Sequence, residues 1–479
     1  MKRSFVITIV LVLISAASFC FAFGIDMSKN KVEHTSEDYV GDVSAAAGLN
    51  ISNSLVSVSH AYWDNSIKFG NDGYQAESRF KFEPVRRVVI YPDPETGFYA
   101  YNIINRAALE KNLPPGIMEE VKQNGGRVHK TCPYTMFYDY YYFEYGLNLP
   151  EISSNSASVA YLGDEWLSEG EREFWNKFYD FFKIPVLEGE TIEADYVLTN
   201  DNRISSWYNN GEGPSYCPEY FSALTDDAMY FTMTLTAQGG QRVDTSCIPG
   251  GYGIYMMPYN PADRKHRGFT KGLLDIDNLR MVFPLDVNTD IKAMGTSTDK
   301  SHLYIVTKED GSIVFRNIRL SDMKCVQEIN AYSGAESIAR MQEDGYILLR
   351  INNDDDLVVI AETSANNYEI IINFDGSGKN SEMHKDFWTG NYASAFSYAC
   401  DKKRLAVAAD NNEQYADASL VYGTGIWLAV YEGNELTYYG KYDSSLCGLN
   451  KKQVYSSTNW DFNLTPHEKP EIEFESDGN

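Results

Sequence analysis

The sequence is short of positive charge. It carries 41 Lys and Arg residues against 67 Asp and Glu residues, which gives a net charge of −26 over 479 residues. A surface that binds nucleic acid needs clustered Lys and Arg to displace counterions from the phosphates. The basic clusters here are short and isolated, at Arg86–Arg87, Arg264–Arg267 and Lys402–Arg404. The composition therefore argues against nucleic acid as a partner and disfavours anionic membrane surfaces.

Long hydrophobic runs are missing except at the N-terminus. Lys2 and Arg3 precede an apolar run from Phe5 to Ala17, and the small residues Cys20 and Ala22 follow. This is the layout of a signal peptide cleaved after Ala22, and the run is shorter than the ~20 residues of a membrane span. We expect residues 1–22 to be removed on export to the periplasm, the cell surface or the medium, with no membrane insertion afterwards. A retained N-terminal anchor is the alternative.

Cysteine is scarce, and no two cysteines are close enough for a Cys-x-x-Cys metal or redox motif. Six of the seven lie beyond the leader, and an even number in an exported chain is compatible with disulfides. Cys217 and Cys247 lie in two Gly/Pro-rich loops and are predicted to pair. Free buried thiols are the alternative, because a chain of this length forms a core without cross-links.

Catalytic signatures are missing as well. The string Gly295–Asp299 ends in Asp where a serine nucleophile elbow needs Gly. In Gly376–Lys379, the residues at 373 and 380 are both Asn, where a phosphate loop needs Gly and then Ser or Thr. None of the seven histidines lies within five positions of another, so no local zinc pair exists. Catalytic residues stay unknown and no cofactor is predicted.

One weak calcium pattern is present. Asp286, Asn288 and Asp290 place oxygen atoms at alternate positions, as a calcium loop does. The sharp turn that follows needs Gly, but Ile291 stands there, and Ser297 occupies the position of the closing Glu. We interpret the segment as an acidic turn between strands, with calcium as the alternative.

The sequence is rich in strand signals. It has 35 Tyr and 24 Phe residues, which suit pleated, half-buried surfaces. The run His302–Thr307 leads through Asp310-Gly311 into Ser312–Ile318, and Asp-Gly between two apolar runs is a strong signal for a hairpin. Similar paired runs follow at Gly345–Ile351 with Leu357–Glu362, and at Arg404–Ala409 with Gly425–Glu432.

These hairpins recur as units. Leu303, Tyr346 and Leu405 hold equivalent places, at steps of 43 and 59 residues, and propeller blades repeat at roughly 40–50 residues with four strands each. Residues 270–462 therefore resemble a β-propeller, although no Trp-Asp or Gly-His blade signature is present. The resemblance implies a mainly β, irregular propeller of about seven blades with two inserted helices. A separate N-terminal α+β domain followed by a β C-terminal half is the alternative.

The remaining segments complete the expected organisation. Residues 23–55 are small and polar and are expected to be a flexible lead-in, and residues 463–479 an acidic, frayed tail. Between the lead-in and the repeats, residues 56–269 are expected to form a β-rich half with two helices. The helix at 114–123 has start and stop signals, and the helix at 164–183 has an aromatic stripe on one face.

Because no catalytic motif is complete, we expect a binding or interaction protein rather than an enzyme. Propeller loops gather into a recognition surface without a local motif, and the ligand is an unknown protein or glycan. The alternatives are an extracellular hydrolase or lyase that acts on carbohydrate, and a structural component of the envelope. A carbohydrate enzyme would need two carboxylates about 5–10 Å apart across a cleft, and no pair stands out.

Overall fold

The computed structural model describes residues 15, 32–56, 61–82, 98–107, 113–133, 138–147, 169–185, 189, 191–208, 217–236, 244–258, 274–343, 345–364, 366–390, 396–414, 420–446, 465–466 and 470–475. The predicted leader therefore lies outside the described residues, apart from Ser15. The described part is mainly β and forms seven antiparallel sheets. It divides into two compact units, residues 1–90 with 334–479 (unit 1) and residues 91–333 (unit 2).

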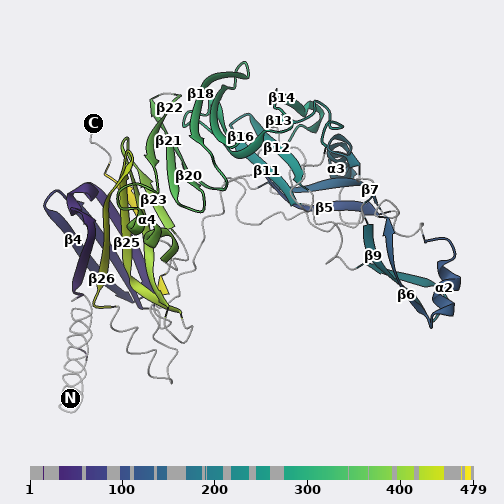
Figure 1. The fold of residues 1–479 in the computed structure, drawn as a ribbon, viewed down its shortest axis with the longest axis horizontal. Helices are drawn as coiled ribbons and strands as arrows, with labels where there is room; N and C mark the ends of the chain where they lie inside the picture. Colours follow the sequence, from purple (N-terminus) through teal and green to yellow (C-terminus); the bar gives the residue numbers. More distant parts are fainter. Residues whose placement is uncertain are drawn as a thin grey trace, which may run out of the picture. The chain divides into compact units, whose positions relative to one another are not determined.

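Unit 1 contains two sheets built from four strands in sequence order, as in propeller blades (Figure 1). The first sheet consists of β19 (Ile338–Glu343), β20 (Tyr346–Ile351), β21 (Asp356–Ser364) and β22 (Asn367–Phe374). The second consists of β23 (Phe396–Cys400), β24 (Arg404–Gln414), β25 (Leu420–Glu432) and β26 (Glu435–Ser444), and β1 (His34–Gly41) adds a fifth strand beside β26. An insertion between the two sheets holds helix α4 (Ser381–Lys385) and the π-helical turn η4 (Asp386–Gly390).

The third sheet of unit 1 joins the two ends of the described chain. Its strands β2 (Leu49–Val56), β3 (Ala61–Gly70) and β4 (Gly73–Phe82) follow the short helix η1 (Val43–Ala46). The C-terminal strands β27 (Thr465–Pro466) and β28 (Glu471–Phe474) both pair with β2. A sheet completed by strands from both ends of a chain is a common way to close a propeller blade, because it leaves no long unpaired edge between them.

Both faces of the β23–β26 sheet are buried, and successive side chains alternate between them. Ala406 of β24 packs in one cluster with Ile51 of β2. Its neighbours Leu405 and Val407 pack in another cluster with Leu348 of β20. This alternation explains why the strand is apolar at almost every position, since one sheet is covered by a second sheet on each side.

Unit 2 contains two further four-stranded sheets and two smaller ones. One sheet consists of β11 (Cys217–Leu224), β12 (Ala228–Thr236), β13 (Gly253–Pro258) and β14 (Arg280–Pro284); the next consists of β15 (Asp290–Thr296), β16 (His302–Glu309), β17 (Ser312–Arg319) and β18 (Lys324–Ser333). The three-stranded sheets are β10 (Ile204–Tyr208), β9 (Thr191–Leu198) and β6 (Arg127–Pro133), and β5 (Phe98–Ala107), β7 (Tyr138–Leu147) and β8 (Ile184–Pro185).

The predicted Asp310-Gly311 hairpin is confirmed, because β16 and β17 pair across these two residues. Both residues have positive φ, 50° for Asp310 and 78° for Gly311, as the two central positions of a type I′ turn require. The sheets bear out the predicted propeller-like repeats. No helix in the described part of the chain is long and apolar enough to cross a membrane.

The two predicted helices are present within narrower limits, as α2 (Ile117–Gln123) and α3 (Glu169–Phe181). The aromatic stripe of α3 docks on the β11–β14 sheet, as expected for a core-facing stripe. Phe178 and Phe182 are fully buried, and the Phe182 ring lies 5.7 Å from Phe231 and 5.1 Å from Tyr255. Trp166 and Leu167, the first residues of the stripe, lie outside the described residues.

Three expectations about organisation need correction. The lead-in expected at 23–55 holds β1, η1 and most of β2, and Leu49 is fully buried. The acidic tail expected at 463–479 contributes β27 and β28 to a sheet. The boundary expected between 56–269 and 270–462 falls inside one sheet, because β13 pairs with β14 across it. Composition misled in the first two cases, because a polar strand with one buried face has few apolar residues.

Candidate functional site

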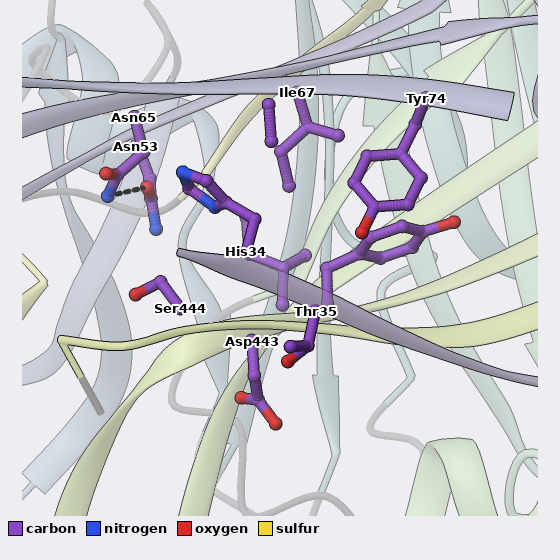
Figure 2. A pocket seen from close by; sticks show the side chains of 11 residues that line it. His34, Thr35, Asn53, Asn65, Ile67, Tyr74, Asp443 and Ser444 are labelled. Atoms are coloured by element: carbon purple, nitrogen blue, oxygen red, sulfur yellow. Dashed lines mark hydrogen bonds between the residues drawn. The ribbon is translucent and has the colours of Figure 1, made fainter. Parts of the chain in front are cut away.

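A pocket opens in unit 1 between two sheets, with β1, β25 and β26 on one side and β2, β3 and β4 on the other (Figure 2). Its enclosed part is small, about 20 Å³, and the wider space of about 330 Å³ around it includes open solvent. The polar residues that line it are His34, Thr35, Asn53, Asn65, Tyr74, Tyr442, Asp443 and Ser444. The pocket exists because β1 extends the second sheet beyond its four strands, so that His34 faces β3 and β4.

The floor of the pocket is a chain of uncharged hydrogen bonds. Asn65 Nδ2 donates to Asn53 Oδ1 at 3.0 Å, and both amides are buried. Ser78 Oγ donates to Asn65 Oδ1 and lies 3.2 Å from His34 Nε2. Figure 2 shows the His34 ring turned toward the two Asn side chains. Because buried polar groups need partners, each member of this chain holds the next in place.

The chain fixes the state of His34. Ser78 has one hydroxyl proton and gives it to Asn65, so its oxygen accepts a proton from His34 Nε2. Burial also lowers the pKa of His34, which favours the neutral ring. A neutral ring that donates from Nε2 leaves Nδ1 as an acceptor. The pocket therefore offers an imidazole acceptor and the amide protons of Asn53, without a cation.

The other wall is made of tyrosines. The Tyr74 and Tyr442 rings meet edge to face, with centroids 4.9 Å apart. The Tyr442 hydroxyl contacts that of Tyr438, which in turn donates to Asp38 of β1. Burial raises the pKa of both Tyr438 and Tyr442 far above the ordinary value, so both phenols stay protonated. The wall presents aromatic surface together with neutral hydroxyls.

One carboxylate, that of Asp443, is among the residues that line the pocket. Its Oδ2 pairs with Lys441 Nζ at 3.0 Å, and Figure 2 shows its side chain directed away from His34 and Asn65. No second carboxylate is among the residues that line the pocket. The pocket thus lacks the two facing carboxylates of glycoside hydrolysis.

The Ser78–His34 contact does not form an activated nucleophile. Activation requires the serine to give its proton to the imidazole, and the imidazole to be oriented by a third group. Ser78 gives its proton to Asn65 instead. The arrangement suits hydrogen bonding to a ligand that both donates and accepts, such as a group rich in hydroxyls. In the part of the chain that the structure describes, no cluster of three His, Cys, Asp or Glu residues is placed to hold a metal ion.

The predicted calcium residues stand in unit 2, in the turn before β15. Asp286 Oδ1 accepts from the Asn288 backbone N–H at 2.8 Å, and Asp290 Oδ2 lies 2.9 Å from Lys292 Nζ. Both carboxylates are thus engaged with protein groups, one as a turn cap and the other in an ion pair.

The predicted Cys217–Cys247 disulfide is absent from the structure, where Cys247 is a free thiol. Its Sγ donates to the Lys183 carbonyl oxygen at 3.5 Å, just beyond the end of α3. The side chain of Cys217 lies outside the described atoms. Loop composition brought these two cysteines together in the prediction, but composition carries no information about the distance between two loops.

Sequence reasoning missed the pocket. Asn53, Asn65 and Ser78 lie on three neighbouring strands, where polar residues ordinarily indicate a solvent-facing side. The signal for the pocket in the sequence is that Asn53 alternates with the apolar Ile51 and Leu55, within the segment expected to be a flexible lead-in.

No family model and no curated protein matches the sequence. Among solved structures, the periplasmic gluconolactonase PpgL of Pseudomonas aeruginosa is similar over 54% of this chain and 78% of its own, with 8% identity and a TM-score of 0.25. The β-propeller domain of Myceliophteria thermophila Cps50 (Swd1) is similar over 52% and 81%, with 8% identity and a TM-score of 0.22. Because these TM-scores are low, the propeller-like assignment depends on the four-stranded sheets of this structure and not on the two similar proteins.

Proposed function

We propose that this chain is an exported, propeller-like binding protein whose small pocket in unit 1 takes one hydroxyl group of a hydroxyl-rich ligand, such as a glycan, while the rest of the ligand lies at the mouth of the pocket. The observation that supports the proposal is the uncharged hydrogen-bond chain from Asn53 to His34 beside a tyrosine wall. Sugar hydroxyls both donate and accept, so they complement an amide donor and an imidazole acceptor. The sugar ring supplies an apolar face that can lie against Tyr74.

Binding is favoured over hydrolysis by the state of the side chains in the pocket. Asp443 is paired with Lys441, and Ser78 gives its proton to Asn65 rather than to His34. General acid–base and nucleophilic chemistry both need a group that can release or take a proton next to the reacting bond. The side chains of this pocket can therefore orient a bound ligand through hydrogen bonds, but none is placed to transfer a proton to or from it.

A glycan array followed by calorimetric titration of the best ligand tests the proposal. We expect Asn65→Ala to weaken binding about tenfold, the equivalent of ~1.4 kcal/mol for the hydrogen bonds that lose their support. Asn367→Ala is the matched control, because this Asn is exposed at the start of β22 in the same unit. Binding that is unchanged in Asn65→Ala, or an array without any ligand, would refute the pocket. Release of reducing sugar would instead favour the hydrolase.

Export is the other part of the proposal. It is supported by the charged start, the apolar run and the small residues before Phe23. Expression of the full chain in a bacterial host, followed by fractionation and intact-mass measurement, should give a product outside the cytoplasm that begins at Phe23. A full-length product in the cytoplasmic fraction would contradict it.

A further inference from the structure

His384 of α4 is fully buried with both ring nitrogens engaged. Its partner Tyr431 packs on the side of the β23–β26 sheet opposite to that of the pocket residues Ile426 and Tyr442. Nε2 lies 2.7 Å from the Asp354 carbonyl oxygen, which can only accept, so Nε2 carries a proton. Nδ1 lies 3.0 Å from the Tyr431 hydroxyl. Trp388 Nε1 donates to that hydroxyl at 3.0 Å, so the phenolic proton is directed to Nδ1. All these polar groups are satisfied together when the imidazole is neutral.

The charged groups around His384 do not stabilise an imidazolium strongly. The turn before β21 brings three carboxylates near, at Asp354, Asp355 and Asp356. Arg350 pairs with the first at 3.2 Å and Lys385 with the second at 3.2 Å. The third accepts the Gly376 backbone N–H at 2.8 Å and the Asn352 side chain.

Three other described elements place uncharged side chains against the ring, namely Phe374 of β22, Tyr431 of β25 and Trp388 of η4. The carboxylates oppose the effect of burial without cancelling it, and the pKa of His384 lies below its ordinary value.

The backbone that His384 holds is strained. Asn352, Asn353 and Asp354 are three consecutive residues with left-handed backbone, at φ of 55°, 58° and 70°. Asn and Asp adopt this region more readily than other non-glycine residues, so the cost per residue is small, but three in succession still depend on contacts from their surroundings. The supports of this turn include the His384 bond to the last carbonyl and the contacts from Ser337 to Asn353. Glu336 and Arg350 add a backbone hydrogen bond to Asn352 and an ion pair to Asp354.

We propose that His384 is an acid-sensitive latch that holds the turn 352–354 and the α4–η4 insertion against the β23–β26 sheet while neutral, and releases them when protonated. A protonated Nδ1 would face the Tyr431 oxygen, which already accepts from Trp388, and the phenolic proton would lose its acceptor. An imidazolium is therefore better solvated in the open segment. The strained turn relaxes as it opens, so both contributions favour the same movement.

The direction of the pH effect on opening follows from the pKa of His384 in the open and the closed segment. The open segment exposes His384, whose pKa then returns to the ordinary value of ~6.5, whereas the closed segment has a lower pKa. As pH falls from 6.5 toward the lower value, the open form takes up the proton first. The opening equilibrium then rises by up to about tenfold per pH unit. Above pH 7 it is independent of pH.

Hydrogen exchange of the full chain, followed by mass spectrometry between pH 7.5 and 5.0 and corrected for the chemical exchange rate, tests the latch. We expect peptides that cover 352–356 and 381–390 to lose protection as the pH falls. In His384→Gln the two bonds can be kept, since the amide N–H donates to Asp354 and the amide oxygen accepts from Tyr431. Gln does not titrate, so its protection should be constant over the same range.

His129→Gln is the matched control, because this exposed histidine lies on β6 in unit 2 and should leave the wild-type pH dependence intact. Protection that is constant in the wild-type protein, or that falls equally in His384→Gln, overturns the proposal. If His384→Gln does not fold, an NMR titration of wild-type His384 decides: a pKa at or above 6.5 overturns the latch, and a lower one supports it.

Discussion

Replacing Phe474 by Ala tests whether the C-terminal strand β28 is part of the folded protein. Its backbone pairs with Leu49 of β2. Its ring lies 4.5 Å below the Arg404 guanidinium and packs on the core cluster between the second and third sheets of unit 1. Arg404 also donates to the carbonyl oxygens of Ala45 and Ala47. The ring therefore supports the side chain that fixes η1 to β24.

The expected loss of stability is about 2 kcal/mol. Full burial of a Phe side chain is worth about 1.5–3 kcal/mol, and a partly buried one roughly half of that. A cation–π contact at the surface adds about 0.5–1 kcal/mol. If residues 463–479 were an unpaired tail, the same substitution would change the stability by less than about 0.5 kcal/mol, as surface substitutions do.

Urea unfolding followed by tryptophan fluorescence measures the difference. Glu473→Ala is the control, because this neighbour on the same strand is exposed and should leave the free energy of unfolding within about 0.5 kcal/mol of wild type. Equal free energies for Phe474→Ala, Glu473→Ala and the wild-type protein would show that β28 does not stabilise the third sheet.

Three further substitutions test separate parts of the two units. Phe182→Ala should cost about 3–5 kcal/mol, because it empties a fully buried site between α3 and the β11–β14 sheet; a thermal melt unchanged from wild type would exclude this docking. Gly376→Ala places a Cβ 2.1 Å from the Asp355 carbonyl oxygen and should cost at least about 1–3 kcal/mol, measured as the urea midpoint. Tyr431→Phe should cost about 2–4 kcal/mol in the same assay, since it removes a hydroxyl that serves a buried imidazole and a buried indole.

The repeated hairpins could be predicted from sequence because their signals are local. Asp310-Gly311 fixes a two-residue turn, and the apolar runs on either side of it are long enough to be strands. The apolar face of the helix at 164–183 could likewise be predicted from the spacing of its aromatic residues, and Phe178 and Phe182 are buried as expected. In each case the information lies within about twenty residues.

The closure of the third sheet could not be predicted, because its partners lie at opposite ends of the chain. In β28, Ile472 and Phe474 alternate with two Glu residues, a pattern too short to outweigh the acidic composition around it. The pocket shares this limit in part, since Asn53 and Asn65 face each other on the neighbouring strands β2 and β3, but His34 reaches them only after β1 has paired with β26. Chemistry that depends on such pairings leaves no local motif.

Burial on both faces restricts where this protein can carry functional groups. In β24 the side chains at 405 to 409 are fully buried, alternately against one neighbouring sheet and the other. A polar side chain there would need a partner inside the core. Polar functional groups are therefore expected where one sheet is no longer covered by the next. Two such places are β1, which extends its sheet beyond four strands, and the α4–η4 insertion, which lies between two sheets in the sequence. His34 and His384 occupy these two places, so substitutions there should alter binding or gating, whereas those within β24 should alter stability alone.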